Sequence, residues 1–462
     1  MNGCIVRSIF LVCCVSAAGL LADRDLWADG GLLATQGLPA DQAAGSRSAQ
    51  SPTSRAAAGA APVNVTVNAP VNVTENVTER VLNLPTVPHD YAPADLPQHF
   101  RSAARFRDNT PDSNPITNAG ATLGRVLFYD RYLSANQKTA CADCHQQRFA
   151  FTDDQKTSVG FDGQRVRRNS MSLVNVRYYR SGRMFWDERA DSLEQQVLMP
   201  IENKIEMGND LDRLIVQLSN DPIYPPLFDQ AFGNRTVTKN RMGRALAQFV
   251  RAIVSYRSKY DVGRAAVENV TDPFPNFTPQ ENLGKEQFFG RGQCANCHLE
   301  QAPDEGHDQS AFFYLLRPAV NGIDSDSDEA DRGVADYSDL AGDVGRFKVP
   351  SLRNIQLTAP YMHDGRFHTL DQVIEHYNWS VRPHPNLDPR LDDFAANGMA
   401  LPEREKVALN QFLLTLTDEP LIADPKFSDP FQRTGGNHGA NDPKDSPSDQ
   451  GGPNGSVGIE IE

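Results

Sequence analysis

Two copies of one pentapeptide are the part of this sequence best suited to chemistry. Residues 141–145 read CADCH, and residues 294–298 read CANCH. The chain has seven cysteines; three lie within the first fourteen residues, and the other four all belong to the pentapeptides. Each pentapeptide therefore pairs two thiols with an adjacent imidazole, which gives the sets Cys141, Cys144, His145 and Cys294, Cys297, His298.

The spacing C-x-x-C-H is that of covalent haem attachment, in which two thiols bond to the haem vinyl groups and the histidine binds the iron. A disulfide would be common in an exported protein, but it does not need the histidines. A four-cysteine zinc site keeps its two halves closer together, and a thioredoxin-like motif needs a βαβ setting that the sequence does not show. We therefore expect two covalently bound c-type haems, with His145 and His298 as iron ligands.

Similar segments lead into the two pentapeptides. Residues 123–145 read LGRVLFYDRYLSANQKTACADCH, and residues 283–298 read LGKEQFFGRGQCANCH. This repeat indicates a duplicated helical unit of the cytochrome c kind. Apolar residues at helical spacing over 240–260 also favour a mainly α chain.

The two ends of the chain predict export and tethering. Residues 1–22 join a basic start to a short apolar run and predict a signal peptide; a lipoprotein anchor at Cys13 or Cys14 is the alternative, but small residues before those cysteines are missing. The segment 23–95 is a low-complexity linker by composition, and 426–462 is an acidic tail; we expect both to be disordered.

The charge of the chain restricts its partners. Its net charge is −14, and its isoelectric point is about 5.2. An acidic surface argues against nucleic acid and anionic membranes as partners. We expect a periplasmic protein with no membrane span.

Between these ends, from about residue 115 to 420, the chain resembles the bacterial di-haem cytochrome c peroxidases, a family that includes the MauG type of enzyme. Besides the haem motifs, the resemblance rests on LFYDRYLS, SVGFDG, RRNSMSLVN, MFWDERADSLEQQ, PIENKIEMG, FKVPSLRN and PYMHDG. It implies a mainly α fold of two cytochrome c-like haem domains, 96–275 and 276–425, with a calcium ion at their interface. It also implies a peroxidatic haem at the first motif and an electron-transfer haem at the second.

The resemblance assigns the acid and base of the peroxide chemistry to Glu194, with Asp187 and Glu188 as neighbouring candidates. Peroxide must lose a proton as it binds iron, and its outer oxygen must gain one as the O–O bond breaks. A carboxylate in the haem pocket can do both.

A calcium site is also implied. The family holds this ion through an asparagine side chain and two backbone carbonyls, and the matching residues are Asn169, Thr358 and Pro360. Ligands that are all oxygens suit Ca²⁺.

Around the first haem the chain departs from the family pattern. Phe161 stands where peroxidases that need reductive activation place an iron-capping histidine, so we expect an open iron site in the oxidised protein. Val174 and Met184 stand where we align a tryptophan between the haems and a glutamine near the peroxide. Trp186 is then the nearest other aromatic candidate for the electron path.

The second haem also departs from the peroxidase pattern. Its methionine ligand is replaced by Tyr377, fourteen residues after His363, and tyrosine is the ligand in the MauG type. Tyr377 falls on the apolar stripe of a predicted helix, whereas His376 falls nearer its polar side. The alternative is that Met362 or Met399 binds the iron and Tyr377 is a packing residue.

Three functions fit these features. The leading hypothesis is reduction of hydrogen peroxide to water, with electrons that reach the second haem from a small cytochrome c or cupredoxin. The alternative is a MauG-like enzyme that uses peroxide to modify residues of a partner protein. The third is a di-haem electron carrier or sensor without turnover, against which Glu194 and the open iron site argue. The resemblance also allows a homodimer.

Overall fold

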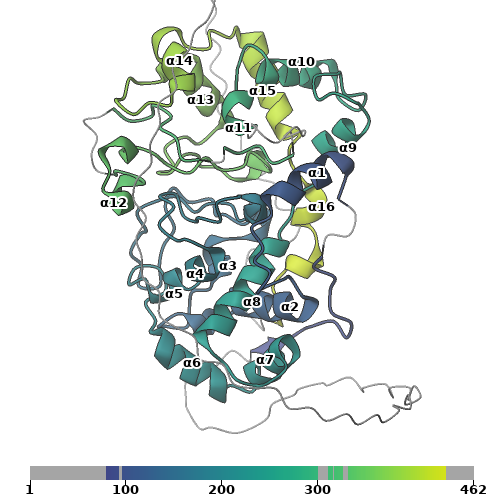
Figure 1. Cartoon of the computed structure of the whole chain (residues 1–462), viewed down its shortest axis with the longest axis vertical. Coiled ribbons are helices and arrows are strands. Elements are labelled where there is room, and N and C mark those ends of the chain that lie inside the picture. Colours follow the sequence, from purple (N-terminus) through teal and green to yellow (C-terminus); the bar gives the residue numbers. More distant parts are fainter. Residues whose placement is uncertain (1–79, 93–95, 300–310, 316, 326–330, 433–462) are drawn as a thin grey trace, which may run out of the picture. The chain divides into compact units, whose positions relative to one another are not determined.

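Short helices joined by long loops make up nearly all the regular structure of the described residues, which confirms the expectation of a mainly α protein (Figure 1). The computed structural model describes residues 80–92, 96–299, 311–315, 317–325 and 331–432, all within the compact unit Pro62–Glu462. The predicted signal peptide, most of the linker and the tail beyond residue 432 lie outside the described residues.

The helices before and around the first haem motif are α1 (Gln98–Arg107), α2 (Asn118–Tyr129), α3 (Cys141–Cys144), α4 (Leu193–Gln196), α5 (Met199–Glu202), α6 (Leu211–Asn220), α7 (Tyr224–Phe232), α8 (Lys239–Ala252) and α9 (Lys259–Ala265). Those that follow are α10 (Pro279–Phe289), α11 (Ala295–His298), α12 (Ala335–Ser338), α13 (Leu370–Glu375), α14 (Asp392–Asn397), α15 (Glu403–Leu414) and α16 (Glu419–Ile422). The strands β1 (Val81–Leu82) and β2 (Phe431–Gln432) pair in antiparallel fashion.

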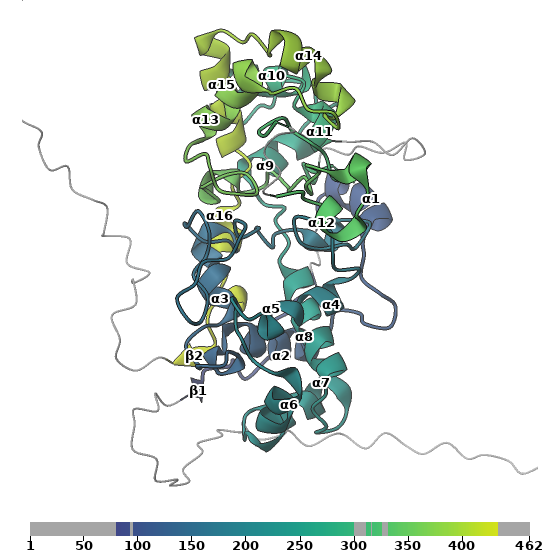
Figure 2. The same ribbon diagram turned by 90° about the vertical axis from the view of Figure 1, so that its left-hand side faces the viewer.

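Helices α2 and α8 lie side by side (Figures 1 and 2), and their backbones come closest at Gly124. A Cβ atom on Gly124 of α2 would lie 2.0 Å from the Ala245 carbonyl oxygen and 2.8 Å from the Phe249 Cβ. Only glycine therefore allows the two backbones to come this close. Thr117 caps the start of α2, because its hydroxyl accepts a hydrogen bond from the Gly120 N–H at 3.0 Å.

Helices α10 and α15 repeat this arrangement. A Cβ atom on Gly284 of α10 would lie 1.9 Å from the Ala408 carbonyl oxygen and 2.8 Å from the Phe412 Cβ. Thr278 and Glu281 form a capping box that starts α10. Gly124 and Gly284 hold the same position in the two lead-in segments, so the sequence repeat corresponds to one helix crossing used twice.

Each crossing lies in its own hydrophobic core. The first core contains Leu123, Val126, Leu127, Leu246 and Phe249, and the second contains Tyr260, Phe274, Phe288, Leu409 and Phe412. A third, smaller cluster joins Phe100 of α1 to Tyr178, Tyr179, Phe312 and Tyr314. The second core already includes Tyr260 and Phe274, which come before the predicted domain boundary at residue 276.

The inner edges of the two predicted terminal segments pack against the first core. Arg80 pairs with Asp130 and Asp221. Tyr91 and Phe427 are both 1% exposed, and their rings are in edge contact. The ordered structure therefore extends beyond the predicted limits, because composition averaged over a long segment hides the few residues that pack.

A buried ion pair connects α1, α9 and the FKVPSLRN segment. Arg353 donates two hydrogen bonds to the Asp261 carboxylate, at 2.8 and 2.7 Å, and His99 Nε2 lies 3.1 Å from the same carboxylate. Burial alone would raise the pKa of Asp261, but Arg353 and His99 outweigh it and hold this pKa well below its ordinary value.

We predict that Asp261→Asn destabilises the protein by about 3–5 kcal/mol, because the variant leaves the fully buried Arg353 charge uncompensated. Urea unfolding followed by circular dichroism measures the loss. The control Asp212→Asn removes an exposed partner of Lys239 and should cost no more than about 1 kcal/mol. Equal losses in the two variants would contradict the prediction.

The same ion pair makes the stability of the fold depend on pH. Because the pKa of Asp261 is lower in the folded than in the unfolded state, its stabilisation is complete above about pH 4 and is lost as the pH falls towards the folded-state pKa. Stability measured between neutral pH and pH 3 should therefore fall less steeply for Asp261→Asn than for the native chain.

Candidate active site

The first haem motif borders a cavity of about 730 Å³, a volume within the range of about 300–1,000 Å³ that suits a bound cofactor. Its lining includes Cys141, Cys144 and His145, together with the loop 166–176 and two residues of α8, Leu246 and Val250. The cavity therefore lies between the haem motif on α3 and the helix that crosses α2.

The side chains of this motif are arranged for covalent haem. The two thiols lie one turn apart on α3, and burial raises the pKa of each to about 12. His145 Nδ1 lies 2.8 Å from the Phe151 carbonyl oxygen, which leaves Nε2 as the nitrogen for iron. Burial also lowers the pKa of His145, so the imidazole is held in the neutral form that binds a metal.

The second haem motif has the same local design. His298 Nδ1 lies 3.2 Å from the Phe313 carbonyl oxygen, and burial lowers the pKa of His298 to about 4. Burial likewise raises the pKa of the Cys294 thiol to about 12. The donors at both motifs thus fit the two c-type haems that the sequence predicts.

Tyr377 lies near the cysteines of the second motif. Burial raises its pKa, the thiols of Cys297 and Cys294 add to the shift, and the side chain of Asn321 opposes it. Asn321 also donates from Nδ2 to the Met362 sulfur at 3.4 Å. Tyr377 and Met362 therefore both lie close to the side chain of Asn321.

The helix that carries Tyr377 changes its geometry at that point. Helix α13 ends at Glu375, and His376–Ser380 form a π-helical turn, which shifts the facing of side chains and is often found at functional sites. His376 is 4% exposed, and its Nε2 lies 3.0 Å from the Asn321 carbonyl oxygen. The expectation that His376 faces the polar side was wrong: His376 keeps α-helical geometry, with its N–H bonded to the Gln372 carbonyl oxygen, but the segment of Asn321 packs against this side of the helix.

Glu194 is engaged elsewhere and is not among the described residues that line the cavity. Its carboxylate accepts two hydrogen bonds from Arg251, at 2.5 and 2.9 Å, and one from Asn114 at 2.7 Å. Burial alone would raise the pKa of Glu194, but Arg251 and Asn114 lower it. The ion pair between Glu194 and Arg251 thus connects α4 to α8.

Three carboxylates do line the cavity: Asp187, Glu206 and Asp336. Asp187 pairs with Arg168 and Arg189, and Asp336 pairs with Arg167 and Arg168. The Glu206 carboxylate has no hydrogen-bond or ion-pair partner among the described residues. Burial raises its pKa, with Arg189 opposing. The sequence analysis missed Glu206, although an acid between two apolar residues in PIENKIEMG was a usable signal.

Phe161 is turned away from the cavity lining and towards the Glu206 loop. Its N–H donates to the Glu206 carbonyl oxygen at 3.0 Å, and a Cβ atom on Gly208 would lie 2.3 Å from the Phe161 ring. His145 is the only histidine among the described lining residues. Within the described chain, no second imidazole is therefore available to cap an iron bound to His145.

Trp186 lies between the cavity and the second haem's segment. It lines the cavity, as do Val174 and Met184, and its indole N–H donates to the Asn169 carbonyl oxygen at 2.8 Å. Its ring meets the His363 ring edge-on, with 6.4 Å between centroids. Trp186 thus contacts the PYMHDG segment while it faces the first haem site.

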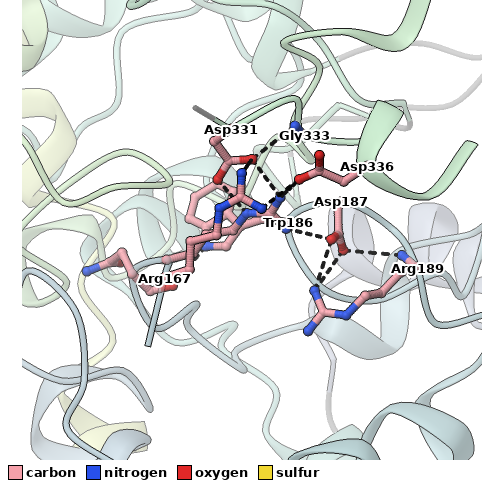
Figure 3. Close-up of polar contacts among 9 residues, drawn as sticks. Arg167, Trp186, Asp187, Arg189, Asp331, Gly333 and Asp336 are labelled. Carbon is pink, nitrogen blue, oxygen red and sulfur yellow. Dashed lines mark hydrogen bonds and ion pairs between the residues drawn. The ribbon is translucent and has the colours of Figure 1, made fainter. Parts of the chain in front are cut away.

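A cluster of charged residues connects the cavity wall to α12 and to the segment before it (Figure 3). Arg168 donates to Asp331 at 2.8 and 2.7 Å and to Asp187 at 2.6 Å. Arg167 donates to Asp336 at 2.7 Å. Since Asp187 follows Trp186 directly, this cluster also holds the tryptophan in place.

Asn169 and the loop that carries Thr358 and Pro360 are neighbours. The Asn169 N–H donates to the His363 carbonyl oxygen at 2.8 Å, and its side-chain Nδ2 donates to the Gln155 and Lys156 carbonyl oxygens at 3.1 and 3.3 Å. Within the described ranges no three His, Cys, Asp or Glu side chains form a metal cluster. A cation here would depend on amide and carbonyl oxygens.

Known proteins resemble this chain over much of its length. The family model described as di-haem cytochrome c peroxidase matches residues 118–266. The methylamine utilization protein MauG of Methylorubrum extorquens is 31% identical over 71% of this chain and 88% of its own length. The cytochrome c551 peroxidase of Nitrosomonas europaea is 32% identical over 55% of this chain and 71% of its own.

A solved structure extends the similarity to the fold. A MauG-like protein associated with microbial copper homeostasis superposes with a TM-score of 0.60 at 32% identity, over 73% of this chain and 99% of that one. The fold and the site therefore define a c-type cytochrome with two haems. The chain belongs to the di-haem cytochrome c peroxidase family and is a peroxidase-type oxidoreductase.

Proposed function

We propose that this enzyme reduces hydrogen peroxide at the haem held by Cys141, Cys144 and His145, with Glu206 as the acid and base. The observation that carries the assignment is that Glu206 is the one unpaired carboxylate among the described lining residues of the cavity. Glu206 replaces Glu194 in this role, since Glu194 is held by Arg251 away from the lining.

The bound haem supplies the redox-active iron at which peroxide reacts. Glu206 accepts the proton that peroxide loses and returns it to the outer oxygen, which leaves as water. Its raised pKa brings the carboxyl group closer to neutral pH, where it can both take and give a proton. Phe161 offers no imidazole, so peroxide has access to the site without prior reduction.

Cys294, Cys297 and His298 would hold the second haem, with Tyr377 as a further ligand of its iron, and this haem would supply electrons to the first site. Trp186 is the residue between the two sites, because it faces the cavity and also contacts His363. Asn169, Thr358 and Pro360 hold a calcium ion next to this tryptophan. Each hydrophobic core then corresponds to one cytochrome c-like haem domain.

The donor is a small cytochrome c or cupredoxin outside the cytoplasm, which the chain reaches as an exported periplasmic protein. None of the described helices has the length and apolar character that crossing a bilayer requires.

A second function, peroxide-dependent oxidation of a partner protein, is favoured by the position of Tyr377 near Cys297 and Cys294. A phenolate ligand favours oxidised iron and makes rapid electron relay harder. Steady-state oxidation of reduced cytochrome c by peroxide separates the two functions. Turnover supports the peroxidase, whereas peroxide consumption without cytochrome oxidation supports the partner-protein oxidase.

We predict that Glu206→Gln lowers kcat/KM for hydrogen peroxide by about 10²–10⁴-fold, because the amide cannot carry the proton. Stopped-flow measurement of the reaction with peroxide checks this. The matched control is Glu202→Gln, an exposed position four residues earlier, which should react like the native enzyme. A Glu194→Gln variant that loses reactivity with an intact fold, while Glu206→Gln keeps it, would reverse the assignment.

We predict that Tyr377→Phe changes the low-spin signal of the oxidised second haem in electron paramagnetic resonance and leaves the first haem's signal as it was. The phenyl ring fits the same space but cannot bind iron. The control Met362→Leu should keep the native signal. The converse result, in which only Met362→Leu alters the second haem, would make Met362 the ligand.

We predict that calcium removal by a chelator lowers the melting temperature and the peroxidase rate, and that added Ca²⁺ restores both. Oxygen ligands from two segments hold those segments together only while the cation is bound. Asn169→Ala should be insensitive to the chelator. A chelator that leaves the native protein unchanged, when calorimetry also detects no Ca²⁺ binding, would contradict the site.

A further inference from the structure

A second buried polar group lies beside the cavity, apart from Glu206. It consists of Tyr179, Glu188 and Lys348, and both Tyr179 and Lys348 line the cavity. The Tyr179 hydroxyl donates a hydrogen bond to Glu188. Lys348 Nζ lies 3.6 Å from the centroid of the Tyr179 ring and donates to the Arg183 carbonyl oxygen at 3.0 Å.

All three side chains are shielded from solvent. Tyr179 is 2% exposed, Glu188 is 6% exposed and Lys348 is 7% exposed. Burial raises the pKa of Glu188, which Tyr179 and Lys348 oppose, and burial lowers the pKa of Lys348 to about 8. A buried carboxylate and ammonium are stable there only because each partly compensates the other.

The backbone at Glu188 is unusual. Its φ angle is +54°, in the left-handed region that favours glycine. The neighbouring Asp187 faces its own partners, Arg168 and Arg189, so Glu188 is free to point to the other side of the turn. A glutamate in this backbone conformation, whose carboxylate is hydrogen-bonded to a phenol, indicates a role for that carboxylate.

A phenol is difficult to oxidise unless its proton leaves with the electron. A carboxylate that already accepts the phenolic hydrogen bond provides the place for that proton. Tyr179 has this partner and lies in the wall of the cavity where peroxide is reduced. Tyr314, whose ring centroid is 5.6 Å from that of Tyr179, also lines the cavity.

We propose that Tyr179 is a redox-active tyrosine, which gives up one electron to the peroxide-oxidised haem site while its phenolic proton moves to Glu188. The Tyr179 O–H bond breaks, the Glu188 carboxylate becomes a carboxylic acid, and a neutral tyrosyl radical remains. Peroxide is the oxidant. An electron from the donor protein, with the proton from Glu188, restores the phenol.

Lys348 compensates the negative charge of Glu188 before the proton is transferred. Its ammonium, close to the ring face, offsets the charge of the Glu188 carboxylate while the phenol is intact. The inference rests on the proposed peroxide chemistry, and it adds a site at which an oxidising equivalent is stored in the protein itself. Such a site is useful when the donor is absent or when the substrate is another protein.

The test is rapid-freeze-quench electron paramagnetic resonance of the full holoprotein after one equivalent of hydrogen peroxide, without a donor. Protein grown with ring-deuterated tyrosine identifies a tyrosyl signal by the narrowing of its hyperfine structure. We expect this signal in the native enzyme and its loss in Tyr179→Phe. Glu188→Gln, which keeps a hydrogen-bond acceptor but cannot take the proton, should also lose most of the signal.

Tyr178→Phe is the matched control. Tyr178 is adjacent in sequence and 1% exposed, but it does not line the cavity and its hydroxyl has no hydrogen-bond partner among the described residues. It should keep the native signal. The optical haem spectrum and circular dichroism of each oxidised variant show whether it folds and holds both haems.

The outcomes are distinct. Native protein whose haem spectrum responds to peroxide without a tyrosyl signal would overturn this inference and leave the peroxidase intact. An undiminished signal in Tyr179→Phe, or an equal loss in Tyr178→Phe, would overturn it as well, and an undiminished signal in Glu188→Gln would remove Glu188 as the proton acceptor. Native holoprotein that does not react with peroxide at all would overturn both this inference and the proposed function.

Discussion

The close approach of two helix backbones at a glycine is the constraint on which the rest of the structure depends. Gly124 lets α2 cross α8, and Gly284 lets α10 cross α15; in each case a Cβ atom would lie within about 2 Å of a backbone oxygen. The first helix of each pair, α2 or α10, is followed by a loop and then by a haem motif whose two cysteines and histidine lie on or next to a short helical turn. The haem motifs are thus attached to rigid helix pairs, and larger residues at either glycine would separate the helices and enlarge the space beside the motif.

The carboxylates around the first motif differ in whether they have ion-pair partners. Asp187 and Asp336 are neutralised by arginines and build the wall, and Glu194 is neutralised by Arg251 and fastens α4 to α8. Glu206 is left unpaired in the lining, and its pKa is raised by burial. A carboxylate that is not committed to structure is the one that can exchange a proton, so the pairing pattern distinguishes the candidate acid from its neighbours.

In the segment from Trp186 to Arg189, neighbouring side chains point to different sides of the cavity wall. Asp187 turns towards the arginines that bind Asp331, whereas Glu188 turns towards Tyr179 and Lys348. Trp186 itself reaches the Asn169 carbonyl and the His363 ring. One short loop therefore combines the connection to the second haem's segment, the calcium candidate and the proposed redox-active tyrosine.

The sequence by itself determined the features whose chemistry is local. A C-x-x-C-H motif brings its three donors together within five residues, so haem attachment, the helical class and the duplicated unit could all be predicted. Only the tertiary structure decided which distant side chains share a cavity. Glu194 lies in α4 and Glu206 follows α5, and the facing of the two acids depends on how α4 packs on α8 and how α5 packs on α4. The burial of His376 depends on the segment of Asn321, and the packing of Tyr91 depends on Phe427, because spacing along one segment carries no information about the surface that packs against it.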